Sequence, residues 1–344
     1  MNIRTKFLTI VTILAVWSCS EKGIIPNNSE NGLPIEFGNV STRAMVTDIN
    51  KFWVSCAISN TSNTAYGSIM ENIEVTHNQQ TNKWEYTDKR YWIDDTYYYF
   101  IGFYSSANNE GYQFNYGKIE DVDRVYYTLD VDTYNDDTHD QVGDDILTAT
   151  KYAHTSDSWT TNVVNLQFRH LFTNINLEIT KDKSDSENQY FITGVSLYGV
   201  STNGTHYIMP GGDSFIESWD VESPKNTNSF DKVYENPVEL EVSKPISVWE
   251  DTDGLLLLPQ NISRASAHIR IDYNYLLKDD DPENDEEDTV EKYVIIDIPA
   301  TDKWQSNSKI TYTLSFANPN KIVFKNVSVE SWGDAQNGGT IIIQ

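Results

Sequence analysis

The residue best placed for covalent chemistry in this chain is Cys19. An apolar run from Phe7 to Trp17 follows two basic residues, and it is too short for a membrane span, which needs about 20 apolar residues. Residues 1–19 are therefore predicted to be a signal peptide. Because a small residue and then cysteine end the run, we expect lipoprotein-type cleavage that leaves an acylated Cys19. The alternative is an ordinary secretory peptide with a cysteine there by chance.

A lipid-modified Cys19 would bind the protein to a membrane. One chain gives marginal anchoring, so a stable anchor needs several acyl chains, such as palmitate, on this residue. Cys56 would then have no cysteine left for an internal disulfide. It shares one face of an alternating segment with Phe52, Val54 and Ile58, so we expect a core residue and not a nucleophile.

Other groups with catalytic potential lack partners in the sequence. Gly212-Asp213-Ser214-Phe215 resembles the opening block of GDS-type esterases, whose serine is the nucleophile. That family needs a later Asp-x-x-His, and here Ala265 stands at that offset before His268, the last histidine. We expect a glycine-rich turn instead. His170 is expected to be a satisfied, partly buried side chain.

Motifs for metals, phosphates and hydrolysis are also missing. The chain contains no H-E-x-x-H, C-x-x-C, phosphate loop or G-x-S-x-G sequence, and its six histidines do not pair at metal-ligand spacing. No two of its 51 acidic residues stand out as a catalytic pair. We therefore expect no enzyme activity, no metal and no cofactor.

The charge balance bears on partners. With 51 acidic and 25 basic residues the net charge is -26, a field that repels nucleic acid, so we expect no nucleic-acid partner. The densest acidic run spans residues 278–288 and is predicted to be a polar hairpin loop. Calcium binding is the alternative, although the run lacks the ordered spacing and glycine of an EF-hand loop.

Elements that would position these groups are nearly all strands. Runs of period two, broken by turn residues, predict an all-β fold, with a short helix near Asp144–Ala153. Around His170 the alternation changes phase, which predicts a β-bulge. The main predicted strands are Tyr97–Tyr104, Val163–Phe168, Leu171–Ile179, Phe191–Val200, Val238–Val242, Gly254–Leu258, Ala267–Tyr275, Tyr293–Ile298, Ile310–Phe316 and Ile322–Val329.

Chain length predicts two domains. After the signal peptide, about 325 residues remain, which is long for one core. A polar stretch at residues 181–188 is the best boundary, so we predict an N-terminal β-sandwich domain over residues 20–182 and a C-terminal one over 183–344.

Several segments, in this order, resemble the fimbrillin-like proteins (Mfa-like and FimA-like) of Bacteroidales-type bacteria, and the resemblance covers nearly the whole chain. No single segment is specific, and their order carries the resemblance. They are the lipoprotein signal, Leu33-Pro34-Ile35-Glu36-Phe37, Thr42-Arg43-Ala44, Trp84-Glu85-Tyr86, Tyr91-Trp92, Phe168-Arg169-His170, Leu257-Leu258-Pro259-Gln260, Lys303-Trp304 to Tyr312, and Val327-Ser328-Val329-Glu330-Ser331-Trp332.

This resemblance implies two tandem transthyretin-like β-sandwich domains in a structural subunit, or a minor tip or anchor component, of a type V pilus. Such a protein reaches the cell outer membrane as a lipoprotein anchored through Cys19. An arginine-specific protease would cut between Arg43 and Ala44, removing a leader strand at residues 33–43, and the slot would accept a strand of another pilus subunit. Tip and anchor members can keep the leader, so the role stays open, and Arg43 could be an ordinary loop residue.

The leader has the pattern this mechanism needs. Leu33, Ile35 and Phe37 alternate with other residues, so they could lay one apolar face into a sandwich. Burying each is worth roughly 1.5–3 kcal/mol. If the strand left, the exposed edge would be an assembly site.

The C-terminus could supply the replacement strand. Residues 340–344 have high strand propensity and no charge, and Ile341 and Ile343 share one face. The alternative is that this segment is the last strand of its own domain.

A different function is also compatible with the sequence. A surface lipoprotein that does not polymerise could bind glycan, or another ligand, on a β-sandwich with Trp84, Tyr91 and Trp92 as stacking platforms. Exposed rings would favour binding, whereas buried rings would favour a core.

Overall fold

The structure is a computed structural model in which every described regular element is a β-strand, as the sequence predicts. None of the described segments is a helix long and apolar enough to cross a bilayer. The described residues are 32–42, 49–60, 67–105, 115–119, 124–138, 140–141, 145–156, 163–185, 188–225, 228–242, 244–249, 253–262, 267–276, 289–299, 304–318, 321–332 and 339–341.

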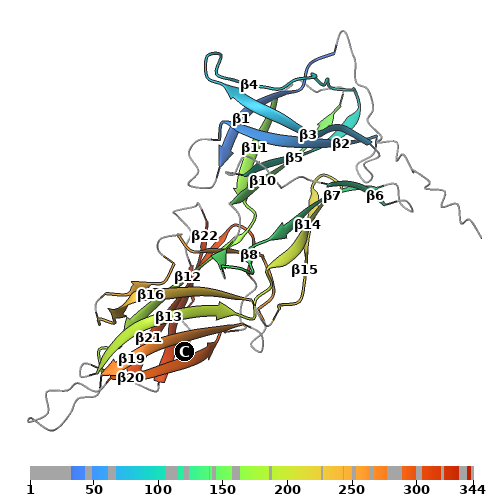
Figure 1. Ribbon diagram of the computed structural model, residues 1–344. Helices are drawn as coiled ribbons and strands as arrows, with labels where there is room; N and C mark the ends of the chain where they lie inside the picture. The colour runs from blue at the N-terminus through green and yellow to red at the C-terminus, as the bar shows by residue number, and fades with distance from the viewer. Residues whose placement is uncertain are drawn as a thin grey trace, which may run out of the picture.

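The first lobe, at the top of Figure 1, is a seven-stranded sheet in the order β1-β11-β10-β5-β2-β3-β4. The sheet curls, because β1 and β4 at its two ends lie close together. Its strands are β1 (Glu36–Thr42), β2 (Lys51–Ser59), β3 (Gly67–Asn78), β4 (Lys83–Glu85), β5 (Thr96–Ser105), β10 (Ile146–Thr155) and β11 (Val163–His170).

Buried apolar side chains, which we call the first-lobe core, fill the inside of this curl. Every strand of the sheet contributes alternate residues to it or packs a side chain against it, as expected for a strand with one face in a core. The core includes Ile35, Phe37, Phe52, Val54, Cys56, Ile58, Val75, Tyr98, Phe100, Leu147, Ala149, Val164, Leu166 and Phe168.

A second, four-stranded sheet, the bridge sheet, packs on the other face of the first-lobe sheet. A separate apolar cluster, with Tyr99, Ile101 and Phe103 on one side and Tyr127 and Leu129 on the other, fills the interface. The bridge sheet has the order β15-β14-β7-β6 and consists of β6 (Asn115–Ile119), β7 (Arg124–Asp132), β14 (Asn203–Pro210) and β15 (Phe215–Val221).

The second lobe is a β-sandwich of two further sheets around its own core, which includes Trp304 and Tyr190. One sheet has the order β17-β12-β21-β22-β23, with β18 also paired to β12, and the other has the order β16-β13-β19-β20. The strands are β12 (Thr173–Lys181), β13 (Gln189–Tyr198), β16 (Ser229–Glu239), β17 (Ile246–Ser247), β18 (Leu255–Leu257), β19 (His268–Leu276), β20 (Thr289–Asp297), β21 (Ser308–Asn318), β22 (Lys321–Ser331) and β23 (Gly339–Ile341). A small pair of strands, β8 (Tyr134–Asn135) and β9 (Asp140–Gln141), packs on this lobe through Tyr134, which is in its core.

The phase change around His170 is a passage between sheets, so the predicted bulge is wrong. β11 ends at His170 in the first-lobe sheet, and β12 begins at Thr173 in the second-lobe sheet. Leu171 and Phe172, between the two strands, are buried in the cluster under the bridge sheet. The alternation changes because the chain changes the core that it faces.

The predicted helix near Asp144–Ala153 is also wrong. Residues 146–153 belong to β10, which pairs with β5 along its whole length, from Ile146 opposite Ser105 to Thr155 opposite Thr96. Its first four residues, Ile146 to Ala149, are all buried, so this part of the strand shows no period of two. Of the strand predicted at Val238–Val242, only Val238 and Glu239 are in a strand, as the end of β16, which begins at Ser229.

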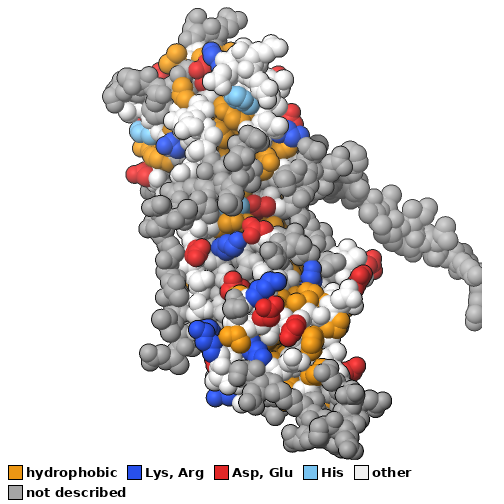
Figure 2. Space-filling view, turned by 90° about the vertical axis from the view of Figure 1, so that its left-hand side faces the viewer, with side chains coloured by type: hydrophobic (Ala, Val, Ile, Leu, Met, Phe, Trp, Pro, Cys, Tyr) orange, Lys and Arg blue, Asp and Glu red, His pale blue; other side chains and the backbone are white. Residues whose placement is uncertain are grey.

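Strand pairing crosses the predicted domain boundary at residues 182–183. β7 precedes this point and β14 follows it, yet the two are neighbours in the bridge sheet, from Asn203 opposite Asp132 to Ile208 opposite Tyr127. The two-domain division stays a prediction. Figure 2 shows one face of the molecule, where basic side chains lie among acidic ones and exposed hydrophobic ones.

Gly254 illustrates a position where only glycine fits. Its φ is +101°, a conformation that residues with a Cβ rarely adopt. A Cβ there would lie 2.4 Å from Asn174 Oδ1 and 2.8 Å from Asn176 Nδ2. These amides cannot move freely, since Asn174 Nδ2 donates a hydrogen bond of 2.6 Å to the carbonyl of Asp253.

We therefore expect Gly254→Ala to lower the unfolding free energy by about 1–3 kcal/mol through backbone strain and the clash. Gly194→Ala is the matched control, because a Cβ at Gly194 would meet nothing closer than 3.5 Å. Chemical denaturation measures both variants, and equal losses of stability would contradict the explanation.

Candidate functional site

The predicted leader is an edge strand of the first-lobe sheet. β1 pairs in parallel with β11, from Glu36 opposite Val163 to Thr42 opposite Phe168, with a register shift between Phe37 and Val40. At the shift the Asn39 N–H donates a hydrogen bond of 2.8 Å to Asn165 Oδ1. A strand at the end of a sheet has one neighbour, so it can leave without splitting the sheet.

Gly38 allows the close approach of β1 to β11. A Cβ at this position would lie 2.3 Å from Val163 Cγ1 and 2.6 Å from Asn165 Oδ1. Any larger residue would push β1 away from its neighbour, so the glycine is a packing requirement.

The residues just before β1 are held from the other side by the segment after β4, which we call the 86–92 clamp. The Ile35 N–H donates to the carbonyl of Arg90 at 2.8 Å, and the Trp92 N–H donates to that of Leu33 at 2.9 Å. The Tyr86 hydroxyl donates to the Ile35 carbonyl at 2.8 Å. The curled sheet is thus closed at this end by hydrogen bonds between distant parts of the chain.

Burial raises the pKa of Tyr86 to about 12, although the Arg90 backbone and side chain oppose the shift. The phenol is therefore neutral at ordinary pH and can act as a donor. The Arg90 side chain in turn donates to the carbonyls of Ile69 and Asp88. The clamp is a connected network rather than a single contact.

Two of the three predicted leader side chains are in the core. Ile35 is 0% exposed and Phe37 is 5% exposed. The Phe37 ring makes edge contacts with Phe52 at 5.5 Å and Phe100 at 6.3 Å between ring centroids. Leu33 differs from the expectation, because its side chain is 57% exposed.

The C-terminal segment forms a short edge strand of the second lobe. β23 is antiparallel to β22, with Ile341 opposite Val327 and Gly339 opposite Val329. Residues 339–341 are thus the last strand of their own sheet in this structure. Ile343 lies outside the described residues, and the role of Ile341 and Ile343 as a donor strand stays a prediction.

An open groove runs along β1 on the side away from β11. It has a volume of about 1200 Å³ and lies between β1 and the β3–β4 hairpin. Its floor contains Phe37 and Tyr86. The described lining residues are Glu36, Phe37, Gly38, Asn39, Val40, Ile49, Asn50, His77, Gln79, Asn82, Lys83, Trp84, Glu85, Tyr86 and Lys89.

Comparison with known proteins gives a family match over residues 42–332, to the model of the fimbrillin-like family. The chain belongs to the fimbrillin-like family. The resemblance inferred from the order of its segments is thereby confirmed. No protein with a curated description matches this fimbrillin-like chain.

Solved structures with a similar fold include a fimbrial protein from Bacteroides vulgatus, with a TM-score of 0.59, 17% identity, and coverage of 87% of this chain and 99% of that one. A proposed cell adhesion protein from Bacteroides uniformis has a TM-score of 0.42, 16% identity, and coverage of 89% and 100%. The C-terminally truncated tip fimbrial protein Mfa3 from Porphyromonas gingivalis has a TM-score of 0.38 and 10% identity, and the match covers 87% of this chain and 99% of that one.

Several predicted processing residues of this fimbrillin-like protein lie outside the described residues. They are Cys19, Arg43 and Ala44, and the acidic run at 278–288 is outside as well. Thr42, the last residue of β1, directly precedes Arg43. The predicted cut would therefore fall at the end of the strand that it is expected to release.

Of the three aromatic residues suggested as a binding platform, Trp92 is buried, whereas Trp84 and Tyr91 are half-buried. Trp92 is 7% exposed, and its ring packs on Tyr98 at 4.5 Å between centroids. Trp84 is half-buried and contacts Phe52 at 5.1 Å. Of these rings, only Trp84 lines the groove.

Groups considered for catalysis have structural roles in this fimbrillin-like protein. The Ser214 hydroxyl donates to the carbonyl of Gly211 in the turn between β14 and β15, as expected for a glycine-rich turn. Cys56 is buried, and burial raises its pKa well above the ordinary value. Within the described ranges no three His, Cys, Asp or Glu residues gather as a metal site.

His170 is more buried than expected. Its side chain is 3% exposed, its Nδ1 lies 2.5 Å from Asp145 Oδ2, and its ring stacks on Trp332 with centroids 3.5 Å apart. The neighbours on β11, β22 and the start of β10 hold it in place at the passage between the lobes.

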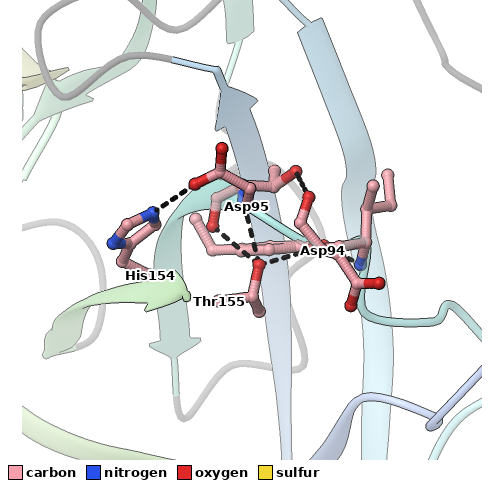
Figure 3. Close-up of polar contacts among 7 residues, drawn as sticks. Asp94, Asp95, His154 and Thr155 are labelled. Atoms are coloured by element: carbon pink, nitrogen blue, oxygen red, sulfur yellow. Dashed lines mark hydrogen bonds and ion pairs between the residues drawn. The ribbon is translucent and has the colours of Figure 1, made fainter. Parts of the chain in front are cut away.

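A polar cluster joins the start of β5 to the end of β10 (Figure 3). His154 Nε2 lies 3.3 Å from Asp95 Oδ1. The Thr155 hydroxyl accepts a hydrogen bond of 2.9 Å from the Thr96 N–H, and the Thr96 hydroxyl donates to the Asp94 carbonyl. Both threonine hydroxyls therefore form hydrogen bonds with backbone groups of the turn at residues 93–96.

A second cavity, of about 400 Å³, lies beside a charged cluster on the bridge sheet. Glu217 binds Arg169, and its Oε2 lies 3.4 Å from His206 Nε2. Burial opposes ionisation of Glu217, but the hydrogen bond from His206 and the charge of Arg169 outweigh it and lower its pKa. Glu217 is therefore charged where it joins β15 to β11.

Sequence reasoning missed the clamp. Tyr86 binds a carbonyl 51 residues away, and no local pattern signals such a contact. The only sequence sign was the aromatic pair Trp84 and Tyr86, which contributed to the family resemblance.

Replacing the buried leader residues should destabilise the first lobe. We expect Phe37→Ala to lower the unfolding free energy by about 3 kcal/mol, because it removes a buried ring and leaves a cavity. Leu33→Ala is the matched control on the same segment and should change the unfolding free energy by less than about 0.5 kcal/mol. Urea denaturation measures both, and similar effects would show that β1 contributes little to the core.

Tyr86→Phe should remove the hydrogen bond to the leader and cost about 1 kcal/mol at neutral pH. A raised pKa means that this stabilisation is complete below the unfolded value of about 10 and is lost as the pH rises toward 12. The difference in unfolding free energy between wild type and variant should therefore shrink from pH 8 to pH 12. A difference that grows with pH would contradict the role of the neutral phenol.

Proposed function

We propose that this fimbrillin-like protein is a structural subunit, or a minor tip or anchor component, of a type V fimbria, and that it assembles by donor-strand exchange after cleavage between Arg43 and Ala44. Membership of the family supports a fimbrial or surface-adhesion role. The observation that carries the mechanism is that β1 is an edge strand ending immediately before Arg43, with Phe37 of the strand and Ile35 just before it both in the core.

Loss of β1 would leave a specific slot. Removing Ile35 and Phe37 would open two pockets in the first-lobe core, which together represent roughly 3–6 kcal/mol of burial. It would also free the edge of β11 that β1 now covers. Such an edge binds another strand readily, with main-chain hydrogen bonds for affinity and pockets for specificity.

The C-terminal strand is suited to fill that slot in a second copy. Ile341 and Ile343 are two residues apart, as are Ile35 and Phe37, so both pairs present side chains on one face of a strand. Within the part of the chain that the structure describes, β23 makes three residue pairs with β22 and lies at the end of its sheet. Little pairing would be lost when it leaves its own chain.

The cellular setting follows from the same proposal. Cys19 would carry the lipid that holds the unprocessed protein in the outer membrane, and an arginine-specific protease would release the processed protein to its fimbrial partners. We further propose that the protein has no enzyme activity, since Ser214, Cys56 and His170 are all engaged in structural contacts.

Cleavage and assembly can be tested with one conservative substitution. After treatment with an arginine-specific protease, wild-type protein should begin at Ala44 and form a ladder on denaturing gels run without heating. Arg43→Lys keeps the charge but removes the cleavage residue, so it should remain uncut and monomeric. Arg270→Lys, on the second lobe, is the matched control and should behave as wild type.

Two results would contradict the proposal. One is a ladder from uncut Arg43→Lys protein, and the other is wild-type protein that is cut after Arg43 but stays monomeric at high concentration. A chain ending at residue 338 should still be cut but should not extend the ladder, which separates the donor role of the C-terminus from the cleavage itself.

A further inference from the structure

We propose that the groove between β1 and the β3–β4 hairpin is a binding site for a neutral oligosaccharide. The groove is about 1200 Å³ in volume, somewhat larger than the roughly 300–1,000 Å³ of small-ligand sites, so it has room for more than one sugar ring. It is bounded by β1 on one side and by the hairpin on the other, so it is long and open rather than enclosed. A chain of sugar rings suits that shape.

The hairpin wall is fixed before any ligand arrives. The Asn78 side-chain oxygen accepts hydrogen bonds from the N–H groups of Gln80 and Thr81 in the turn. Its amide nitrogen donates to the Glu85 carboxylate, to which the Thr81 hydroxyl also donates. A wall held in this way binds without a large loss of conformational entropy.

Side-chain amides project along the groove. Asn50, Gln79 and Asn82 are exposed lining residues, and none of their side chains takes part in the hairpin network described above. An amide carries two donors and an acceptor, which matches the mixed donor and acceptor character of sugar hydroxyls. The half-buried Trp84 adds an aromatic surface for the apolar face of a sugar ring.

The charge of the groove favours a neutral ligand. Its described lining residues include two glutamates, Glu36 and Glu85, and two lysines, Lys83 and Lys89, so the charges of these residues balance in a chain whose net charge is -26. Lys89 is also held over the Tyr86 ring at 4.2 Å. A strongly acidic or basic ligand would meet as many repulsive as attractive groups.

An added peptide strand is the competing occupant. It would need apolar pockets at alternate positions along the groove. The lip is instead formed by exposed polar side chains of the hairpin, and the described apolar lining residues are Phe37, Val40, Ile49, Trp84 and Tyr86. The two on β1, Phe37 and Val40, are three positions apart, so they do not form the alternating row that a paired strand needs. The arrangement therefore favours sugar over peptide.

Because β1 supplies one wall, the site is complete only while the leader is in place. If the proposed strand exchange occurs, a bound sugar that contacts both β1 and the hairpin would hold the leader and slow its release. This consequence rests on the proposed function, whereas binding to the uncut protein does not.

The test uses the uncut full chain and calorimetric titration with chitohexaose, mannohexaose, xylohexaose and cellohexaose, each up to about 1 mM, the weak end of specific binding. At least one sugar should bind. The double variant Asn50→Ala, Gln79→Ala should raise its Kd about tenfold or more, and Trp84→Ala should abolish binding. Because Trp84 also packs on Phe52, the amide variant is the decisive one.

Matched controls are Gln189→Ala, an exposed amide on β13, and Tyr293→Ala, an aromatic residue on β20 that is 61% exposed. Both should bind as wild type. Absence of binding by all four sugars, or unchanged affinity in the double variant, would overturn the proposal. So would binding of a peptide with the sequence of residues 339–344 that the double variant weakens, since it would assign the groove to a strand. Ladder formation is measured separately, so failure of the sugar site leaves the assembly test intact.

Discussion

The pairing of β1 with β11, together with the packing of its side chains in the core, is the interaction on which the first lobe depends. This strand is held along one edge by β11, while the residues before it are held by the 86–92 clamp. Ile35 and Phe37 then fill the space that a curled seven-stranded sheet leaves at its seam. A short segment thus closes a core whose other strands include one that pairs with it 126 residues later in the chain. Its removal would open that core at a defined place.

Local pattern was sufficient where one face of a strand met one core. The alternation of Ile35 and Phe37 identified the buried face of the leader, and the alternation around Cys56 placed that thiol in the interior. The local pattern was insufficient for Leu33. This residue continues the same alternation, but it precedes the residues that pair with β11, and its side chain is exposed to solvent. Periodicity states which side chains share a face, and only the fold determines how far that face is covered.

Tertiary context accounts for the other differences. β10 is buried on both faces at its start, from Ile146 to Ala149, so its sequence lacks the alternation that would have distinguished it from a helix. His170 marked a real discontinuity, but the sequence could not distinguish a bulge within one sheet from a passage between two. Tyr86 and the groove depend on contacts between segments far apart in the chain. The segment order, by contrast, identified the family from the sequence alone.

The pairing of β7 with β14 has a mechanical consequence. These strands come from opposite sides of residue 182 and share six residue pairs, from Asn203 with Asp132 to Ile208 with Tyr127. Tension applied to the two lobes would load this ladder together with the covalent connections between them, of which the one from β11 to β12 is an example. Extension would then require several hydrogen bonds to break together in addition to stretching these connections. The bridge sheet therefore makes the molecule a stiff element under a pulling force.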